Sequence, residues 1–322
     1  MPTVTVLILN YNHARFLEQR IQSVLRQTYQ DFEIIYLDDA SNDHSAEVFA
    51  PYSCDERIRS IINTTNSGNP FKQWNKGVGA ARGEYIWIAE ADDYADECFL
   101  ERLVTALEAH PSAGVAYCQS MSVDEQGRPL GTMQWWTRDL NATRWQHDFF
   151  NNGPDECKRY LANRNTIPNA SGVLFRRQVY LEAGGADENM RLCGDWKCWV
   201  NCLLRSDVVY VAEALNFFRS HDRSVRQITE LNGILCLENY RMLAFIGQQC
   251  AITPSMRRNV LRRQRNQWLF TLFSIPWKRN LQIYGLASRL DRDIRFHLFR
   301  KILRKTFGLW LKSRSRIEPQ AN

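Results

Sequence analysis

The sequence lacks any run of the ~18–20 consecutive apolar residues that a membrane-spanning helix requires. It also lacks the basic segment that opens a secretory signal, because residues 1–9 contain no Lys or Arg and have the apolar pattern of a strand. We therefore expect a cytoplasmic protein, with peripheral attachment to the inner face of the cytoplasmic membrane as the second location to consider.

Paired cysteines are absent as well. The nine Cys are an odd number without regular spacing, which favours reduced, buried thiols over a disulfide framework. Cys198 and Cys202 lie four residues apart on a predicted helix, but no further ligands at zinc spacing accompany them. We expect neither a disulfide-stabilised fold nor a structural zinc site.

Glycine-rich nucleotide loops are also missing. The pattern G-x-x-x-x-G-K-[ST] does not occur, and Arg82 stands where G-x-G-x-x-G would need a glycine in the segment 77–83. That segment also precedes a predicted strand instead of following one. A P-loop and a Rossmann dinucleotide site are therefore both disfavoured.

Acidic residues are scarce in the last part of the chain. Residues 251–322 contain 17 Lys and Arg but only 3 Asp and Glu, whereas residues 1–250 contain 24 and 32, so a net charge of +6 hides an acidic body and a basic tail. A strongly basic segment of this kind predicts an anionic partner.

The residues that are present are those of a globular α/β protein. With 44% hydrophobic and 24% charged residues, 322 residues suit one large domain with an appendage, or two domains. Strand-like and helix-like segments alternate, which predicts a mixed, mainly parallel sheet flanked by helices. The expected strands are Val4–Leu9, Phe32–Leu37, Arg57–Ile62, Tyr85–Ala89, Gly114–Cys118, Pro168–Phe175 and Val208–Ala212, and the expected helices are Ala14–Gln27, Ser41–Phe49, Phe71–Ala81, Asp96–Ala109, Arg176–Ala183 and Asp195–Leu204.

Polar clusters follow the first four predicted strands. They are Asn10 to His13, Asp38 to Ser41, Asn66 to Asn69, and Glu90 to Asp93. Ligands of parallel sheets bind at the carboxyl ends of the strands. Four such clusters at one edge therefore predict a binding site there.

The fourth cluster brings three carboxylates, Glu90, Asp92 and Asp93, into one turn after a buried strand. Carboxylates this close repel one another, and a divalent cation such as Mg²⁺ or Mn²⁺ would remove that cost. The alternative is a solvated cluster that caps the following helix, since Asp is common at helix N-termini. The local sequence alone does not decide between them.

In their order and spacing, these segments resemble the start of family 2, GT-A type glycosyltransferases. The resemblance covers roughly residues 3–225 and rests on several motifs that agree jointly. They are Val6–Asn12, Ser23–Thr28, Phe32–Ile34, Asp38–Asp43, Asn66–Gly68, Ala81–Ile86 and Ala91–Asp93.

The resemblance implies roles for individual residues. It implies that Asp39 accepts a hydrogen bond from a nucleobase, that Asp92 approaches the ribose and that Asp93 binds a divalent metal, Mn²⁺ or Mg²⁺, as in the DXD motif. His221, in Arg219-Ser220-His221, resembles a later family segment and would bind the metal or the diphosphate. The expected nucleotide-sugar-binding residues are Leu9, Asn10, Tyr11, Asn12, Asp39, Asn66, Lys72 and Asp92.

The family also places an acidic pair before a tryptophan-bearing helix. Here the segment reads Gly194-Asp195-Trp196, so that only the second acid is kept. The resemblance implies that Asp195 is the catalytic base, which deprotonates an acceptor hydroxyl that then attacks the anomeric carbon with inversion. An N-cap is the structural alternative for Asp195. Solvated lysine is the corresponding alternative for Lys72.

The C-terminal segment interleaves Lys and Arg with aromatic residues. This pattern is typical of helices that lie on anionic membranes. A basic helical subdomain that packs against the catalytic body is the alternative, and nucleic-acid binding is disfavoured because no such motif accompanies the charge. Gln264 to Trp268 only approaches the Q-x-x-R-W motif of processive family members.

We therefore expect a GT-A catalytic domain at 1–225, with a nucleotide-sugar half to about residue 110 and an acceptor half after it, and a basic helical region at 226–322. The expected function is transfer of a sugar, with UDP-sugars as the favoured donors, to a glycan or lipid-linked acceptor in bacterial surface-polysaccharide assembly. The alternatives are a catalytically degenerate nucleotide-sugar or glycan-binding protein, favoured by Gly194, and a sugar-phosphate nucleotidyltransferase.

Overall fold

The computed structural model describes residues 1–221 and 232–314, with side chains up to residue 305. The chain divides into two compact units, Met1–Ser224 with Gln249–Ala251, and Val225–Gln248 with Ile252–Asn322. The domain boundary expected at 225/226 lies outside the described residues.

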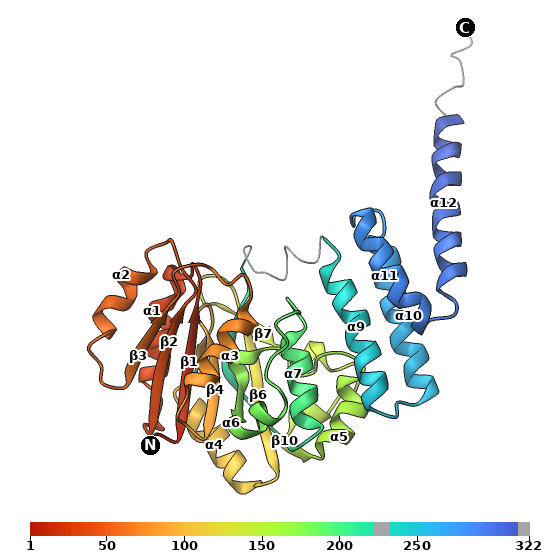
Figure 1. The fold of residues 1–322 in the computed structure, drawn as a ribbon. Coiled ribbons are helices and arrows are strands. Elements are labelled where there is room, and N and C mark those ends of the chain that lie inside the picture. Colours follow the sequence, from red (N-terminus) through yellow and green to blue (C-terminus); the bar gives the residue numbers. More distant parts are fainter. Residues whose placement is uncertain (222–231, 315–322) are drawn as a thin grey trace. The chain divides into compact units, whose positions relative to one another are not determined.

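The first unit contains a mixed sheet in the order β3-β2-β1-β4-β9-β6-β10-β5 (Figure 1). Strands β1 to β4 are mutually parallel, β10 is parallel to β6, and β9 joins the two groups by pairing antiparallel with β4 and β6. Short strands β5, β7 and β8 pair antiparallel at the periphery. The strands are β1 Val4–Asn10, β2 Phe32–Asp38, β3 Ile58–Ile62, β4 Tyr85–Glu90, β5 Tyr94–Ala95, β6 Ala113–Val123, β7 Pro129–Thr132, β8 Phe149–Asn151, β9 Val173–Arg176 and β10 Asp207–Arg219.

Helices flank this sheet, as the alternating pattern predicts. They are α1 Ala14–Leu25, α2 Ser45–Phe49, α3 Pro70–Ala80, α4 Phe99–Ala109, α5 Gly153–Glu156, α6 Arg177–Glu182 and α7 Gly194–Leu203. The predicted mixed, mainly parallel α/β architecture is confirmed.

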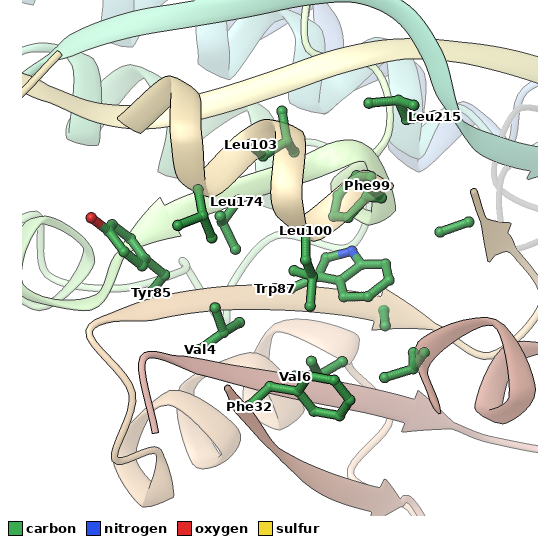
Figure 2. Close-up of a cluster of buried hydrophobic side chains, with 14 of the residues drawn as sticks. Val4, Val6, Phe32, Tyr85, Trp87, Phe99, Leu100, Leu103, Leu174 and Leu215 are labelled. Atoms are coloured by element: carbon green, nitrogen blue, oxygen red, sulfur yellow. The ribbon is translucent and has the colours of Figure 1, made fainter. Parts of the chain in front are cut away.

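The main core lies between the sheet and helices α1 and α4. Trp87 of β4 stacks on Phe99 of α4, with ring centroids 4.4 Å apart, and Leu100 and Leu103 of α4 cover the neighbouring strands (Figure 2). Strands β1, β2 and β4 are buried along almost their whole length. Burial on both faces explains their continuous apolar runs.

Strand β6 runs to Val123, past the expected end at Cys118, as the partner of the long strand β10. Two further strands differ from the sequence prediction. Strand β10 runs to Arg219, well past the expected end at Ala212, because it pairs with β6 along its length through two irregular register shifts after Val211. Strand β9 begins at Val173 instead of Pro168, because Asn169 caps a short 3₁₀ turn by accepting from the amide of Ser171. Both differences arise from contacts that local propensity does not encode.

In the part of the second unit that the structure describes, there are four helices, α9 Ile234–Gln249, α10 Pro254–Thr271, α11 Trp277–Leu290 and α12 Ile294–Arg314. Its core surrounds Trp268, whose indole donates to the Asn280 side chain at 2.8 Å. The segment that approaches Q-x-x-R-W therefore belongs to a structural core, since Trp268 is fully buried. Within the described residues, no helix is both long and apolar enough to cross a membrane.

Candidate active site

The loops after β1 and β2 are fastened to each other at the carboxyl edge of the sheet. The amide of Asn12 donates to the Ser41 hydroxyl at 2.9 Å, and the Asn12 side chain accepts from the amide of Asn42 at 2.8 Å. Asn12 and Ala40 both have positive φ, 57° and 62°. For an alanine this conformation is costly, and such strain persists only where surrounding contacts enforce it.

Asp39 lies at the centre of a polar cluster beside these loops, which we call the Asp39 cluster and which also contains Asn63, Asn66, Ser67 and Gln73. Its carboxylate accepts from the Asn63 amide group at 2.6 Å, the Ser67 amide and hydroxyl at 2.9 and 2.7 Å, and the Gln73 amide group at 3.0 Å. Asn66 donates to the Asp39 carbonyl at 3.1 Å. The predicted residues Asp39 and Asn66 are thus brought together, and these hydrogen bonds fix the direction of the Asp39 carboxyl group.

The remaining predicted donor residues differ in exposure. Leu9 and Asn10 are buried, and the Asn10 amide group donates to Asp38 at 2.7 Å, so that its visible role is to join β1 to β2. Tyr11, directly after β1, is exposed. Lys72, on the first turn of α3, is exposed and its ammonium lies 3.4 Å from the Ser67 carbonyl oxygen.

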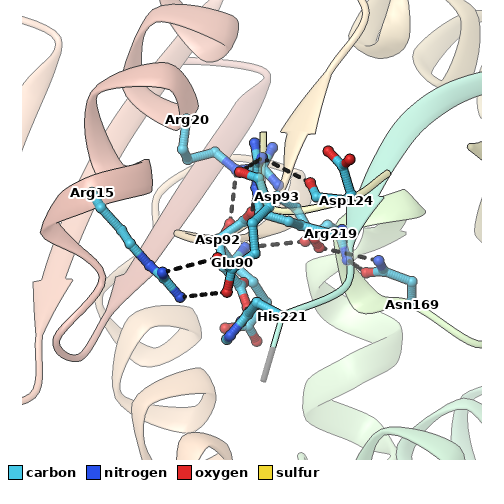
Figure 3. A network of polar contacts seen from close by, with 11 residues as sticks. Arg15, Arg20, Glu90, Asp92, Asp93, Asp124, Asn169, Arg219 and His221 are labelled. Carbon is cyan, nitrogen blue, oxygen red and sulfur yellow. Dashed lines mark hydrogen bonds and ion pairs between the residues drawn. The ribbon is translucent and has the colours of Figure 1, made fainter. Parts of the chain in front are cut away.

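A cluster of potential metal ligands forms where β4 and β10 end. The nearest ligand atoms of His13, Asp92 and His221 all lie within 4.8 Å of one another. His221 Nε2 lies 3.0 Å from an Asp92 carboxylate oxygen, and the imidazole rings of His13 and His221 meet edge to face with centroids 5.6 Å apart. Figure 3 shows Asp92 and His221 side by side in this network.

The chemistry of this cluster fits a divalent cation. Burial lowers the pKa of His13, so that its imidazole is the neutral form that ligates metals. Burial alone would raise the pKa of Asp92, but the hydrogen bond with His221 holds it below the ordinary value. The Nδ1 atom of His221 is buried and has no hydrogen-bond partner within the described residues.

Asp93, the predicted metal ligand, points away from this cluster. Its two carboxylate oxygens accept from the Arg219 amide at 2.9 Å and from the Asn169 side chain at 3.0 Å (Figure 3). The Arg219 guanidinium continues this network by donating to the Asp92 carbonyl at 2.8 Å. Asp93 thus fastens the end of β10 to the loop after β4.

Burial of so many carboxylates perturbs their protonation. Desolvation, followed by the charge of Asp92, raises the pKa of Glu90 to about 8 and that of Asp93 to about 6. Arg20 of α1 is the buried cation beneath them, and it donates to the Glu90 carbonyl at 2.8 Å. Burial lowers the pKa of Arg20 to about 10, which leaves its positive charge intact at neutral pH.

Asp195, the predicted catalytic base, occupies the first turn of α7. Its carboxylate accepts from the Asn165 side chain at 2.9 Å and from the amide of Trp196 at 2.6 Å. Cys193 is the N-cap residue, so the N-cap alternative for Asp195 is not what the structure has. An acid in the first turn is favourably placed in the field of the helix dipole.

Gly194 has a steric explanation. A Cβ atom at this position would lie 2.6 Å from Cδ2 and Cζ of the Phe71 ring, closer than any side chain tolerates. The missing acid at position 194 is therefore a consequence of Phe71 packing. It does not indicate that catalysis has been lost, which removes the one feature that favoured a degenerate binding protein.

Two residues of the site, His13 and Asn169, are not predicted individually from the sequence. His13 belongs to the polar cluster after the first predicted strand, and its position directly after that strand is the available signal. Asn169 carries no such signal, because its contact with Asp93 joins residues 76 positions apart.

The fold and the site define an α/β enzyme of the GT-A glycosyltransferase class. Residues 5–180 match the family described as glycosyl transferase family 2. The chain belongs to this family, and it is an enzyme that transfers glycosyl groups.

Relatives bear the same description. An uncharacterized glycosyltransferase of Haemophilus influenzae is 29% identical over 231 residues, which covers 70% of this chain and 68% of that protein. One from Nostoc sp. is 35% identical over 227 residues, covering 68% and 65%. The glycosyltransferase GlyG of Streptococcus pneumoniae is 36% identical over 101 residues, and the match spans 31% of this chain and 33% of that relative.

Solved structures share the fold. Residues 1–349 of S. aureus TarS, in complex with UDP-GlcNAc, align with a TM-score of 0.65 at 13% identity over 93% of this chain and 89% of that one. The mannosyltransferase PcManGT of Pyrobaculum calidifontis, in complex with GDP-Man and Mn²⁺, aligns with a TM-score of 0.61 at 15% identity over 94% and 84%. At these identities the likeness concerns the fold alone.

The contact between Gly194 and Phe71 predicts a non-additive pair of substitutions. Gly194→Ala should lower the free energy of unfolding by about 1–3 kcal/mol, because the added methyl group overpacks against the ring. The same change should cost clearly less in a Phe71→Leu background, as measured by urea unfolding. Gly79→Ala is the matched control, since a Cβ there meets nothing within 4 Å. Equal costs of Gly194→Ala in both backgrounds would contradict the steric explanation.

The raised pKa values predict that stability declines with pH. An ordinary glutamate has a pKa of 4.5 and Glu90 of the folded protein about 8, so the folded state retains a proton that the unfolded chain has released between these values. The free energy of unfolding should therefore fall as pH rises from about 5 to 8, by up to ~1.4 kcal/mol per pH unit for each such group.

Urea unfolding at several pH values, with a metal chelator present, measures this dependence. Glu90→Gln should flatten the slope, because the amide does not titrate. Glu97→Gln, at an exposed position just before α4, should leave the slope as it is. An unchanged slope in Glu90→Gln would show that Glu90 is ionised in the folded protein at all these pH values.

Proposed function

We propose that this chain is a metal-dependent, inverting glycosyltransferase that uses a nucleotide-sugar donor. The observation that carries the proposal is the cluster of His13, Asp92 and His221, which lies at the same sheet edge as the Asp39 cluster. The structural neighbours were solved with UDP-GlcNAc and with GDP-Man and Mn²⁺, which supports a donor of this class.

The donor nucleotide would occupy the edge formed by the ends of β1, β2 and β3. Asp39 is oriented by its four donors and would accept a hydrogen bond from a ring N–H of the base. Tyr11 and Lys72 are exposed at this edge, where they are available to the base or ribose and to a phosphate oxygen, respectively. UDP-sugars remain the favoured donors.

Asp92, His13 and His221 would hold the cation. We assign the carboxylate ligand to Asp92 and not to Asp93, because Asp92 lies beside the two imidazoles, whereas Asp93 accepts from Arg219 and Asn169. Two imidazoles beside one carboxylate favour Mn²⁺ over Mg²⁺, which prefers oxygen ligands. A bound divalent cation neutralises the charge that develops on the departing nucleoside diphosphate.

Asp195 would act as the general base. In this role its carboxylate removes the proton of the acceptor hydroxyl, which attacks the anomeric carbon on the face opposite the diphosphate and inverts it. Asn165 orients the carboxylate and is itself bound to the 3₁₀ helix Met133–Trp136, since the Trp136 indole donates to the Asn165 carbonyl at 2.7 Å. Trp135 of this 3₁₀ helix is 61% exposed. Its indole offers a flat surface on which an acceptor sugar could stack.

We propose a glycan or lipid-linked acceptor, in bacterial surface-polysaccharide assembly, and attachment of the C-terminal unit to an anionic membrane surface. Support comes from the basic composition of residues 251–322 together with exposed aromatic side chains on α10, α11 and α12. These are Phe270, Trp277, Phe296 and Phe299, which are 83%, 68%, 60% and 61% exposed. Cationic helices with exposed aromatic residues bind the interface of anionic bilayers.

Donor binding predicts a metal-dependent gain in stability. One nucleoside diphosphate of a panel, at 100 times its Kd, should add about 2.7 kcal/mol to the stability of the protein, and more with Mn²⁺ than without it. Asp92→Asn and His221→Gln should abolish the increment due to the metal. His110→Gln, far along the chain and stacked on Phe150, is the matched control. Failure of every nucleotide to raise the melting temperature of the folded protein would refute the donor site.

The role of Asp195 predicts a separation between binding and turnover. Asp195→Asn should lower kcat by about 10²–10⁴-fold, because the amide cannot accept the proton, while donor affinity stays the same. Glu182→Gln, at an exposed carboxylate of α6, should change neither quantity. Steady-state kinetics and nucleotide titration measure the two effects. Retention of most of the turnover in Asp195→Asn would place the base elsewhere.

A further inference from the structure

Two adjoining hollows lie in the helical unit, apart from the residues of the transferase site. One has a volume of about 210 Å³ and lies among the end of α9, the first half of α10 and the end of α11. The other has a volume of about 720 Å³ and lies along the first half of α10 and the turn between α11 and α12. The two hollows adjoin each other, because both are lined by Arg257, Leu261 and Leu290.

The smaller hollow is mainly apolar. Leu243, Ala244 and Gly247 of α9 line it on one side, and Val260 and Leu261 of α10 on the other. An apolar cavity of ~150 Å³ is sufficient to hold a benzene molecule. The hollow therefore has room for a segment of a hydrocarbon chain.

The larger hollow is rich in arginine. Arg257, Arg258, Arg262, Arg265 and Arg292 line it together with two carboxylates, those of Asp291 and Asp293.

Arg265 is 92% removed from solvent and pairs with Asp291 at 2.9 Å, while its Nε atom has no hydrogen-bond partner within the part of the chain that is described. The other four arginines form no ion pair with any carboxylate of residues 1–221 and 232–305.

The spacing of these residues gives α10 a composite face. Arg258 and Arg262 are four residues apart, as are Arg257 and Leu261, so that charged and apolar side chains lie along neighbouring stripes of one helix. Unpaired arginines in a cleft favour an anion, and phosphate in particular, because the guanidinium fork matches its oxygens. An adjoining apolar hollow favours an anion that carries a hydrocarbon chain.

We infer that the helical unit binds a single anionic phospholipid, with the phosphate in the arginine cleft and one acyl chain in the apolar hollow. This inference deepens the proposed attachment of the unit to an anionic membrane surface and rests on it. In place of a diffuse attraction between charges, it predicts a site with one defined position for the lipid headgroup and another for an acyl chain. The cleft lining includes no aromatic side chain on which a base could stack, which disfavours a nucleotide as the occupant.

Short-chain lipids that remain monomeric test the site in the full-length protein. Dihexanoyl phosphatidylglycerol supplies an anionic head and two chains, dihexanoyl phosphatidylcholine the same chains without net charge, and glycerol phosphate the head alone. Isothermal titration should show that the first binds at least about tenfold more tightly than either of the others. Equal affinities for the two dihexanoyl lipids would overturn the inference, as would equal affinities for phosphatidylglycerol and glycerol phosphate.

Separate variants address the head and the tail. Arg258→Ala combined with Arg262→Ala should weaken phosphatidylglycerol binding at least about tenfold, because two charge-assisted contacts are lost. Lys278→Ala combined with Arg289→Ala removes the same charge from α11 outside both hollows and should have little effect. Equal losses in the two double variants would show diffuse attraction only.

Gly247→Leu tests the apolar hollow. Gly247 lines this hollow, and a Cβ there meets nothing within 4 Å, so a leucine can extend into the space without disturbing the helix. It should weaken phosphatidylglycerol binding at least about fivefold and leave glycerol phosphate binding unchanged, whereas Gly247→Ala should bind as the wild type does. Unchanged lipid affinity in Gly247→Leu would overturn the placement of the chain.

Nucleotide titration of the same variants separates this inference from the transferase proposal. All of them should retain metal-dependent nucleoside diphosphate binding, since the substituted residues belong to the helical unit. Loss of lipid binding with intact nucleotide binding identifies a lipid site that is independent of the donor site. Nucleotide binding that falls together with lipid binding would show that the arginine cleft takes the nucleotide, and it would overturn the lipid assignment.

Discussion

Charge compensation at the end of β4 is the interaction on which the rest of the site depends. Three carboxylates, Glu90, Asp92 and Asp93, follow a buried strand within four residues. Buried carboxylates without partners would either take up protons or, if they stayed ionised, destabilise the turn. Arg20 donates to the Glu90 carbonyl beneath the turn, and the Arg219 amide donates to Asp93 beside it. The hydrogen bond with His221 holds the pKa of Asp92 below its ordinary value.

The order of the strands brings this turn close to the other polar residues of the site. Strand β1 lies between β2 and β4. The Asp39 cluster, which follows β2, and the turn with Asp92, which follows β4, therefore lie on the two sides of the end of β1. Strand β10 reaches the same turn from the far half of the sheet and delivers His221, which is 129 residues away from Asp92 in sequence. Its extension past Ala212 is what makes this contact possible, because a strand that ended there would stop short of His221.

The two units divide the physical problem between them. The first unit builds a rigid polar edge from a sheet whose central strands are buried on both faces, and it carries the residues of glycosyl transfer. The helical unit has its own core around Trp268 and presents arginines and aromatic side chains outward. Separate cores would allow the acidic catalytic body and the basic helical unit to bind the two different partners that we propose for them, a nucleotide-sugar and an anionic surface.

The sequence by itself determined the α/β architecture, the edge of the sheet that carries the site, and the chemical types of its residues. It could do so because apolar runs and the polar residues that end them are local in the chain. Only the tertiary structure decided that Asp92 and His13 face His221 while Asp93 turns inward to Asn169, and that Phe71 excludes a side chain at Gly194. These outcomes depend on contacts between residues 76 to 208 positions apart or on steric fit, and neither leaves a periodic trace in the sequence.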